Sequence, residues 1–258
     1  YMNNTKVANE IRKGIAKTGK DEENLCVVSR MKKRKHLSIT YTISNPLSCL
    51  ACDVADAIYT LWRTSESTYF TTGQVLRALS CDPGQTITDQ KKLEINKCIY
   101  QLMNTKIDID CTEEMRAREK ISFKETMTFG GNYLSAEDET EGDALIDNDN
   151  EDASSGKLKM NRKYKFTGDD PMPLYAYAAT VGQFVTVPNS LLAMPEENGK
   201  KLAQDTMENI MIKRYLIRRM ETIRYNNNLK TRSFRYLKAP HGTDPGMISQ
   251  LDVKREDF

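Results

Sequence analysis

Three amphipathic segments, separated by short spacers, constrain the fold of this chain more than any other feature of its sequence. Apolar residues recur every three or four positions in residues 47–63, 74–79 and 88–104, as they do on one face of an α-helix. Asp82-Pro83-Gly84 marks a turn between the second and third segments. We therefore expect three consecutive helices that pack around a shared core.

Segments with the alternating pattern of β-strands lie on both sides of these helices. Residues 36–44 alternate before the first helix, and residues 106–110 alternate directly after the third. Residues 120–129 alternate again as far as Gly130-Gly131, and residues 158–166 resume the pattern. A helix-turn-helix followed by a β-hairpin is the order of a winged helix. The expected fold class is therefore α+β, with a winged-helix domain over residues 37–225.

The remaining segments extend this domain at both ends. Residues 1–36 are polar and charged, and we expect a basic flexible arm. Residues 174–178 and 183–187 suggest a hairpin, and residues 205–225 have the pattern of a long helix. Residues 226–258 have a turn-rich composition and are expected to be a basic tail or the start of a second winged-helix unit.

An acidic stretch interrupts the predicted wing. Residues 135–155 contain nine carboxylates and no basic residue. Low hydrophobicity together with high net charge predicts disorder, so we expect a disordered acidic insertion over residues 135–156. It is either a solvated linker or a decoy for DNA that covers a basic face and tunes affinity through its charge.

Basic residues gather in the last third of the chain. Residues 200–238 contain eleven lysines and arginines and three acids, which gives 11 − 3 = +8. Segregated basic charge is the signature of a polyanionic partner. In the long helix we expect Ile212, Leu216, Met220 and Ile223 to face the core, with an arginine stripe on the opposite side. The phosphate contacts expected from this track are Lys213, Arg214, Arg218, Arg219, Arg224, Lys230, Arg232 and Arg235. The alternative is a surface helix with local ion pairs.

The third helix is the candidate for reading bases. Its expected buried stripe is Ile95, Cys98, Ile99 and Leu102. Amides and lysines, which can reach base edges and phosphates, lie on the opposite face. The DNA contacts expected from this helix are Gln90, Lys91, Lys92, Lys97, Gln101 and Asn104. The alternative is an ordinary solvated helix face.

Signatures of enzymes and metal sites are missing from the sequence. It has no GxxxxGK[ST] loop, no GxSxG and no HExxH. The pair Cys49 and Cys52 has no second CxxC at metal-binding spacing, and helical packing explains it better. No apolar run approaches the length of a membrane span. We expect a non-enzymatic protein without metal or cofactor, in the cytoplasm and associated with the nucleoid.

Two segments resemble the winged-helix replication initiators of bacterial plasmids and related mobile elements. In the first, residues 99–109, a helix ends in a leucine and a Thr-Lys-Ile step leads into the wing. The second combines Pro173-Leu174-Tyr175 with the helix at residues 208–219. The resemblance covers residues 37–225. It implies sequence-specific binding of repeats in double-stranded DNA, a homodimer in a monomer–dimer switch, and host replication proteins as partners.

Two alternatives to the initiator remain open. The first is a winged-helix transcriptional regulator, since the fold is the same and the acidic insertion is not part of the initiator pattern. The second is a protein–protein adaptor whose acidic loop and basic helix bind partners without nucleic acid. Binding that weakens steeply with salt would favour the first two classes over the adaptor.

Overall fold

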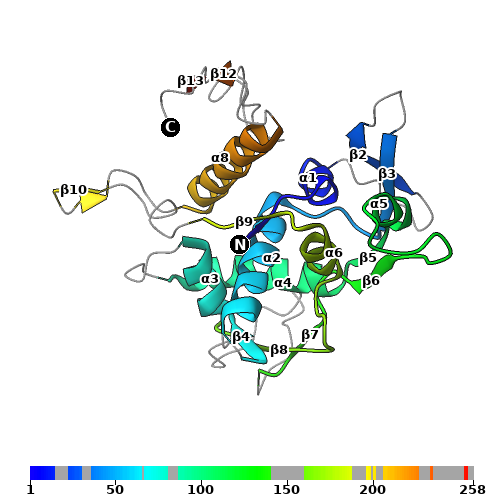
Figure 1. Ribbon diagram of the computed structural model, residues 1–258. Coiled ribbons are helices and arrows are strands. Elements are labelled where there is room, and N and C mark those ends of the chain that lie inside the picture. The colour runs from blue at the N-terminus through cyan, green and yellow to red at the C-terminus, as the bar shows by residue number, and fades with distance from the viewer. Residues whose placement is uncertain are drawn as a thin grey trace.

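A computed structural model gives the arrangement of the chain (Figure 1). It describes residues 1–14, 23–30, 36–65, 67–80, 87–140, 160–187, 196–198, 200–201, 206–226, 233–234 and 253–254. The fold is mixed α and β, as the sequence predicts.

Helix α2 (Cys49–Thr64) runs through the middle of the fold (Figure 1). It begins at Ser48, whose hydroxyl accepts a hydrogen bond from the Ala51 N–H at 3.0 Å. Every residue from 51 to 59 is buried, as expected of a helix that is enclosed on all sides. Helices α3 (Thr72–Ser80), α4 (Asp89–Met103) and α8 (Met207–Asn226) all contact it.

A four-stranded antiparallel sheet lies beside the helices. Its order is β2 (Asn24–Arg30), β3 (His36–Ile43), β5 (Lys106–Asp110) and β6 (Thr128–Asn132). Alternate residues of β3 and β5 enter the core, namely Ile39, Tyr41, Ile43, Ile107 and Ile109. Helix α5 (Thr112–Ala117) contacts β3, and α1 (Lys6–Arg12) contacts β2.

A three-stranded sheet joins distant parts of the chain. Its order is β4 (Tyr69–Thr71), β8 (Lys163–Phe166) and β7 (Ala136–Asp138), all antiparallel. Strand β4, which lies between α2 and α3, therefore pairs with the hairpin formed by β7 and β8. Phe70 stacks on Tyr164 with their ring centroids 5.2 Å apart, which fastens the sheet to the core.

The other elements are shorter. Strand β1 (Met2–Asn3) pairs with β9 (Phe184–Val185), which follows helix α6 (Pro173–Val181). Two further antiparallel pairs join β10 (Glu196–Glu197) to β11 (Lys200–Lys201) and β12 (Ser233–Phe234) to β13 (Val253–Lys254).

Local periodicity located many elements correctly. The strand predicted at residues 36–44, the three helices, the strand at 106–110 and the long helix are confirmed as β3, α2 to α4, β5 and α8. The N-terminal arm is a correction, because residues 1–12 form β1 and α1 and are packed into the fold. Val7, Ala8 and Ile11 are buried on one face of α1, so this segment contributes to the core.

The strand predicted at residues 120–129 is wrong. Helix α5 ends at Ala117, residues 118–127 form a loop, and the strand begins only at Thr128. Phe123 is 86% exposed, so the apolar residues of this loop do not share a buried face. Gly130-Gly131 continues the strand instead of ending it, because both glycines pair with β5. The Asp108 carboxylate of β5 lies against Gly130, where a side chain would displace it.

The hairpin predicted at residues 174–187 is also wrong. Pro173 stands in the first turn of α6, where its missing N–H costs nothing, and Gly182 ends the helix with φ +67°. The acidic insertion begins later than predicted, since Ala136–Asp138 is strand β7. The rest of the predicted insertion, residues 141–156, lies outside the described part of the chain, as do residues 157–159.

Candidate nucleic-acid interface

Helix α4 has one buried face and one polar exposed face. Ile95, Cys98, Ile99 and Leu102 are buried, as the sequence predicts. Gln90, Lys97 and Asn104 are exposed and recur at intervals of seven residues, so they form one line along the helix and its C-terminal cap. We call these three residues the α4 stripe. The side chain of Lys97 has no hydrogen-bond or ion-pair partner among the described residues.

Within the stripe, Gln90 donates to Glu94 at 3.2 Å and Asn104 donates to the Tyr100 carbonyl at 2.9 Å. Two other residues predicted on this face also make contacts within the fold. Gln101 is partly buried, and its side-chain N–H donates to the Pro46 carbonyl at 2.9 Å. Lys92 pairs with Asp89 at 2.8 Å. Lys91 is also partly buried. The stripe is therefore narrower than the six residues that the sequence predicts.

The hairpin of β7 and β8 is held against α4 by buried hydrogen bonds from Asn96. Its amide nitrogen donates to the Met160 carbonyl at 3.0 Å, and its amide oxygen accepts from the Tyr164 hydroxyl at 3.2 Å. The Thr72 hydroxyl at the start of α3 donates to the same oxygen at 2.6 Å. Asn96 thus ties together α3, α4 and the hairpin.

A second contact between the hairpin and α4 is ionic. Arg162 donates to Asp138 at 2.6 Å across the hairpin, and the Tyr100 hydroxyl of α4 donates to the same carboxylate oxygen at 2.8 Å. Burial alone raises the pKa of Asp138, but hydrogen bonds from Thr140, Tyr100 and Arg162 outweigh it, so this pKa lies below its ordinary value. The carboxylate therefore remains charged at neutral pH.

The N-terminus of α3 is also joined to the hairpin. The Gly73 N–H donates to the Asn161 side chain at 2.8 Å, and the Thr72 N–H donates to the Arg162 carbonyl at 3.1 Å. Thr71 and Gln74 bond to each other's N–H groups, which closes a capping box. Helices α3 and α4 and the β7–β8 hairpin therefore form one rigid unit, and the α4 stripe lies on its exposed side.

The arginines of α8 lie where the sequence analysis did not expect them. Arg214 and Arg218, predicted to form a surface stripe, are 3% and 6% exposed. Arg218 pairs with Asp53 and, at 2.5 Å, with Asp56, both of α2. Arg214 Nε lies 3.5 Å from Asp53. Neither arginine lies on the surface, so the predicted surface stripe is wrong.

The buried side of α8 is nearly opposite to the predicted one. Met207, Ile210, Arg214 and Arg218 are buried, whereas Ile212, Leu216 and Met220 are partly exposed. Charge compensation explains this orientation, because Asp53 and Asp56 are about 1% and 0% exposed and buried carboxylates require counter-ions. The sequence does show two acids three positions apart within the apolar helix α2, but it does not show which element supplies their counter-ions.

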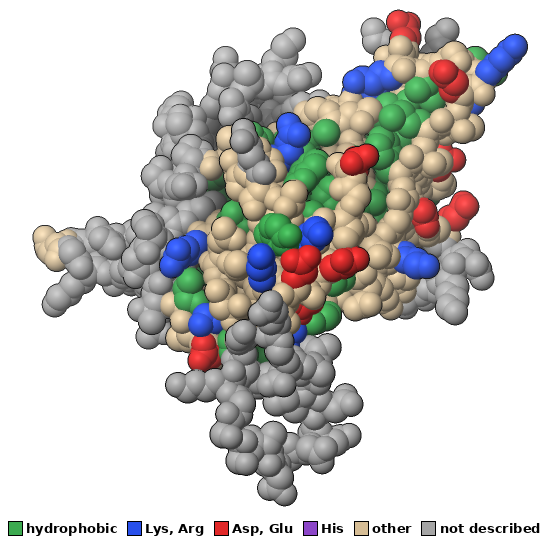
Figure 2. Space-filling model, turned by 90° about the horizontal axis from the view of Figure 1, so that it is seen from below, with side chains coloured by type: hydrophobic (Ala, Val, Ile, Leu, Met, Phe, Trp, Pro, Cys, Tyr) green, Lys and Arg blue, Asp and Glu red, His purple; other side chains and the backbone are tan. Residues whose placement is uncertain are grey.

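The rest of the predicted basic track is not assembled on the described surface. Lys213 and Arg219 are partly buried. The described part of the chain does not include the side chain of Arg224 or the residues Lys230, Arg232 and Arg235. Figure 2 shows one face of the molecule, on which basic and acidic side chains are interspersed. This face is not a continuous basic surface.

The described part of the chain also bears on metal sites and membrane spans. In that part of the chain, no three His, Cys, Asp or Glu side chains gather closely enough to hold a metal ion. None of the described helices is both long and apolar enough to cross a membrane.

Comparisons with known proteins give weak similarities. No protein-family model and no curated protein sequence matches the chain. One similar solved structure is that of domains 2 and 3 of RctB, with 10% identity and a TM-score of 0.45 over 87% of this chain and 71% of that chain. A selenomethionine derivative of the same domains has 11% identity and a TM-score of 0.40 over 73% and 68%. Both scores are below 0.5, so neither establishes a shared fold.

Proposed function

We propose that this chain is a non-enzymatic, sequence-specific DNA-binding protein built on a winged helix. In this proposal α2, β4, α3, α4 and the β7–β8 hairpin are the parts of the winged helix, and α4 is the recognition helix. The order of these elements supports it, as does the pairing of β4 with β8, which places a strand between the first two helices beside the hairpin. The acidic residues 141–159 then belong to the wing.

The observation that carries the proposal is the α4 stripe on a helix that is fixed beside the hairpin. Gln90, Lys97 and Asn104 are side chains of the types that bond to base edges in a major groove. Readout of bases requires a helix that does not move relative to its supports. Asn96 and Tyr100 supply such support from the sides of α4 that meet the hairpin.

In this proposal, cations around α4 contact the phosphates, and the arginines of α8 do not. Lys163 is exposed at the first residue of β8, and its ammonium lies 4.0 Å from the centre of the Tyr69 ring. Few cations among the described residues flank the stripe. We therefore expect the affinity for DNA to fall less steeply with salt concentration than it would for a long basic track.

The biological role that we favour is initiation of replication on a plasmid or another mobile element, in the cytoplasm at the nucleoid. The resemblance of residues 99–109 and 173–175 to plasmid initiators supports this role by sequence pattern alone, because residues 106–110 form β5 of the four-stranded sheet and are not part of the proposed wing. In this role the chain binds host replication proteins as partners and requires no cofactor. A transcriptional regulator is the second candidate, and iterated target sites would distinguish an initiator from it.

Selection from a random duplex library tests the function directly. The complete chain should enrich a defined sequence, and Gln90→Ala and Lys97→Ala should each lower affinity for it by about 1–3 kcal/mol, with a smaller effect on random DNA. Lys13→Ala is the matched control, because this exposed lysine lies at the end of α1, away from the stripe.

Two outcomes would contradict the proposal. If no sequence is enriched and binding is insensitive to salt, the adaptor that binds proteins becomes the better explanation. If Lys13→Ala and Lys97→Ala change specificity equally, α4 is not the recognition helix.

A further inference from the structure

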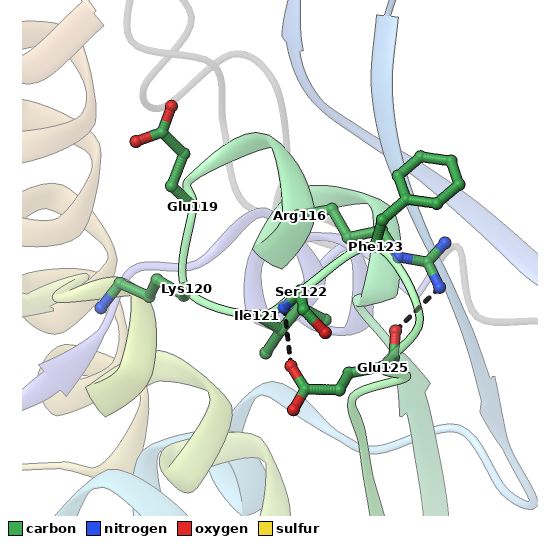
Figure 3. A pocket seen from close by; sticks show the side chains of 7 residues that line it. All are labelled: Arg116, Glu119, Lys120, Ile121, Ser122, Phe123 and Glu125. Carbon is green, nitrogen blue, oxygen red and sulfur yellow. Dashed lines mark hydrogen bonds between the residues drawn. The ribbon is translucent and has the colours of Figure 1, made fainter.

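The loop after α5 presents an aromatic ring to solvent. Phe123 is 86% exposed, the highest value among the large apolar side chains described. It borders an open hollow of about 440 Å³, shown in Figure 3. We call the surface around it the Phe123 patch. Its residues are Arg116, Glu119, Lys120, Ile121, Ser122, Phe123 and Glu125.

Hydrogen bonds fix the shape of this loop. Arg116 donates to the Glu125 carbonyl at 2.7 Å, and the Ser122 N–H donates to the Glu125 carboxylate at 2.6 Å (Figure 3). Lys120 donates to the Thr180 carbonyl of α6 at 2.7 Å. The Arg116 guanidinium lies 5.3 Å from the centre of the Phe123 ring. The ring is therefore held in an exposed position by an ordered loop.

The charges of the patch narrow the choice of partner. Two cations, Arg116 and Lys120, and two carboxylates, Glu119 and Glu125, line the hollow, with Arg116 near the ring and Glu119 and Lys120 at the other end of the loop (Figure 3). Equal numbers of cations and carboxylates give the patch no net attraction for the phosphates of a nucleic acid, so it does not extend the proposed DNA interface. The patch has no net charge, so two identical copies of it do not repel each other. Each copy also offers both signs for pairing.

We infer that the Phe123 patch binds the same patch of a second copy of this chain. Around a two-fold axis a surface meets itself, so it must be complementary to itself in shape and charge. Phe123 can then lie against its symmetry mate near the axis, over the hollow, with the carboxylates of one copy facing the cations of the other. The contact removes from water a ring that the monomer leaves exposed.

The first test measures self-association of the complete chain by sedimentation velocity over a wide range of concentrations. Wild type should form dimers, and Phe123→Ser should raise the dissociation constant by about tenfold or more. Because the ring is exposed, this variant should keep the fold. Leu25→Ser is the matched control, since Leu25 of β2 is 65% exposed and alternates with the buried Cys26. A monomeric wild type, or equal effects of the two substitutions, would overturn the inference.

A charge exchange tests whether the patch contacts itself. Glu119→Lys makes the patch positive and Lys120→Glu makes it negative, so each variant alone should dimerise more weakly than wild type. An equal mixture of the two should associate more tightly than either variant alone, because opposite patches then meet. Dimers that form through another surface would show no such gain, and that result would refute the assignment.

Discussion

Arg218 of α8 and Asp56 of α2 form an ion pair in which the Arg218 Nη2 and Asp56 Oδ2 atoms lie 2.5 Å apart and the side chains are 8% and 0% exposed. The same carboxylate accepts hydrogen bonds from the Asn3 N–H at 2.9 Å, from the Tyr175 hydroxyl at 2.8 Å and from Arg12 at 3.0 Å. Asp56 therefore connects β1, α1, α6 and α8 to the central helix. Asp56 and Asp53 together compensate most of the charge of three buried guanidinium groups, those of Arg12, Arg214 and Arg218.

Neutralising Asp56 should destabilise the fold strongly. Asp56→Asn removes one of two carboxylates and leaves buried cations without compensation, which costs about 3–5 kcal/mol in comparable sites. Denaturation in urea, followed by the fluorescence of Trp62, the single tryptophan, measures the free energy of unfolding. Asp169→Asn is the control, because Asp169 is exposed and should change this free energy by less than about 0.5 kcal/mol. Equal stability of Asp56→Asn and wild type would show that the ion pairs do not hold α8.

Arg218 and Lys163 should differ in their effects on DNA binding. Arg218→Ala should lower the free energy of unfolding, yet leave unchanged the slope of log K against log salt concentration for the folded protein. Lys163→Ala should keep stability and reduce that slope by about one, as expected when one phosphate contact is lost. Titrations of duplex DNA at several salt concentrations measure both. A reduced slope for Arg218→Ala would mean that α8 leaves α2 when DNA binds.

The sequence predicts those parts of the fold in which one helix or strand buries its own apolar face. The stripe Ile95, Cys98, Ile99 and Leu102 fixes the orientation of α4, and this explains why the exposure of Gln90, Lys97 and Asn104 could be predicted. The orientation of α8 could not be predicted in this way, because it depends on carboxylates in α2. In the pair of Arg218 and Asp56, the two residues are 162 positions apart in the sequence. Apolar periodicity alone assigns Ile212 and Leu216 to the buried face of α8 and the arginines to the exposed face, which is the reverse of the structure.

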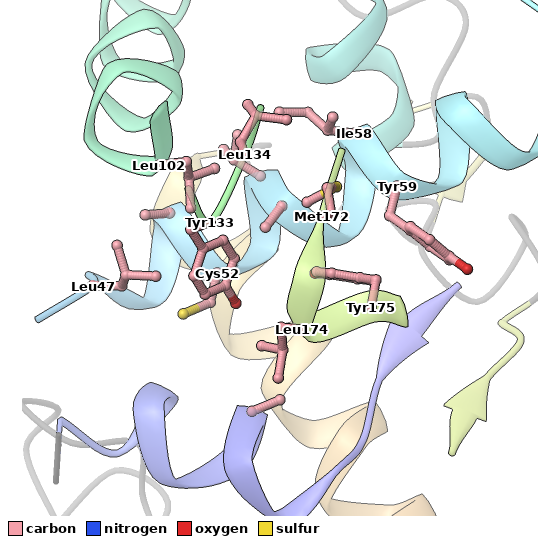
Figure 4. Packing of buried hydrophobic residues seen from close by; sticks show 14 of the residues in the cluster. Leu47, Cys52, Ile58, Tyr59, Leu102, Tyr133, Leu134, Met172, Leu174 and Tyr175 are labelled. Carbon is pink, nitrogen blue, oxygen red and sulfur yellow. The ribbon is translucent and has the colours of Figure 1, made fainter. Parts of the chain in front are cut away.

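Helix α6 shows a different limit of sequence patterns. A short apolar run fits a buried strand and a buried helix equally well. In the structure Leu174 and Tyr175 of α6 lie close to residues of α2, among them Cys52 and Tyr59 (Figure 4). The rings of Tyr175 and Tyr59 stack with centroids 4.6 Å apart. Because the helix is enclosed on several sides, its sequence shows no amphipathic period. The signals that could have identified it are Pro173 in its first turn and Gly182 at its end.

Acid should loosen the contact between the hairpin and α4. The folded state lowers the pKa of Asp138, so its ion pair with Arg162 is fully present above the ordinary carboxyl pKa of about 3.9 and is lost as pH falls through the lowered value. Asp138→Asn should therefore be less stable than wild type at neutral pH, and this difference should shrink below about pH 4. Urea denaturation across this range measures it, with Glu137→Gln, exposed on the same strand, as the control. A difference that does not depend on pH would show that the charge of Asp138 is not what stabilises the contact.

Removal of residues 141–159 should preserve the fold and tighten DNA binding. The residues on either side are anchored, since the Glu139 N–H donates to the Lys163 carbonyl at 2.9 Å and the Met160 carbonyl accepts from Asn96 at 3.0 Å. A short Gly-Ser linker can replace the segment, whereas deletion of residues 135–155 would remove β7 and Asp138 and should destabilise the protein. The segment carries six acids and two lysines, a charge of 2 − 6 = −4. Because the described residues on either side of it contact α4 or β8, we expect it to compete with phosphate for Lys97 and Lys163. A variant of full length with the six acids changed to Asn or Gln should bind DNA as tightly as the deletion does. If both variants bind like wild type, the segment is a solvated linker, and its charge does not regulate binding.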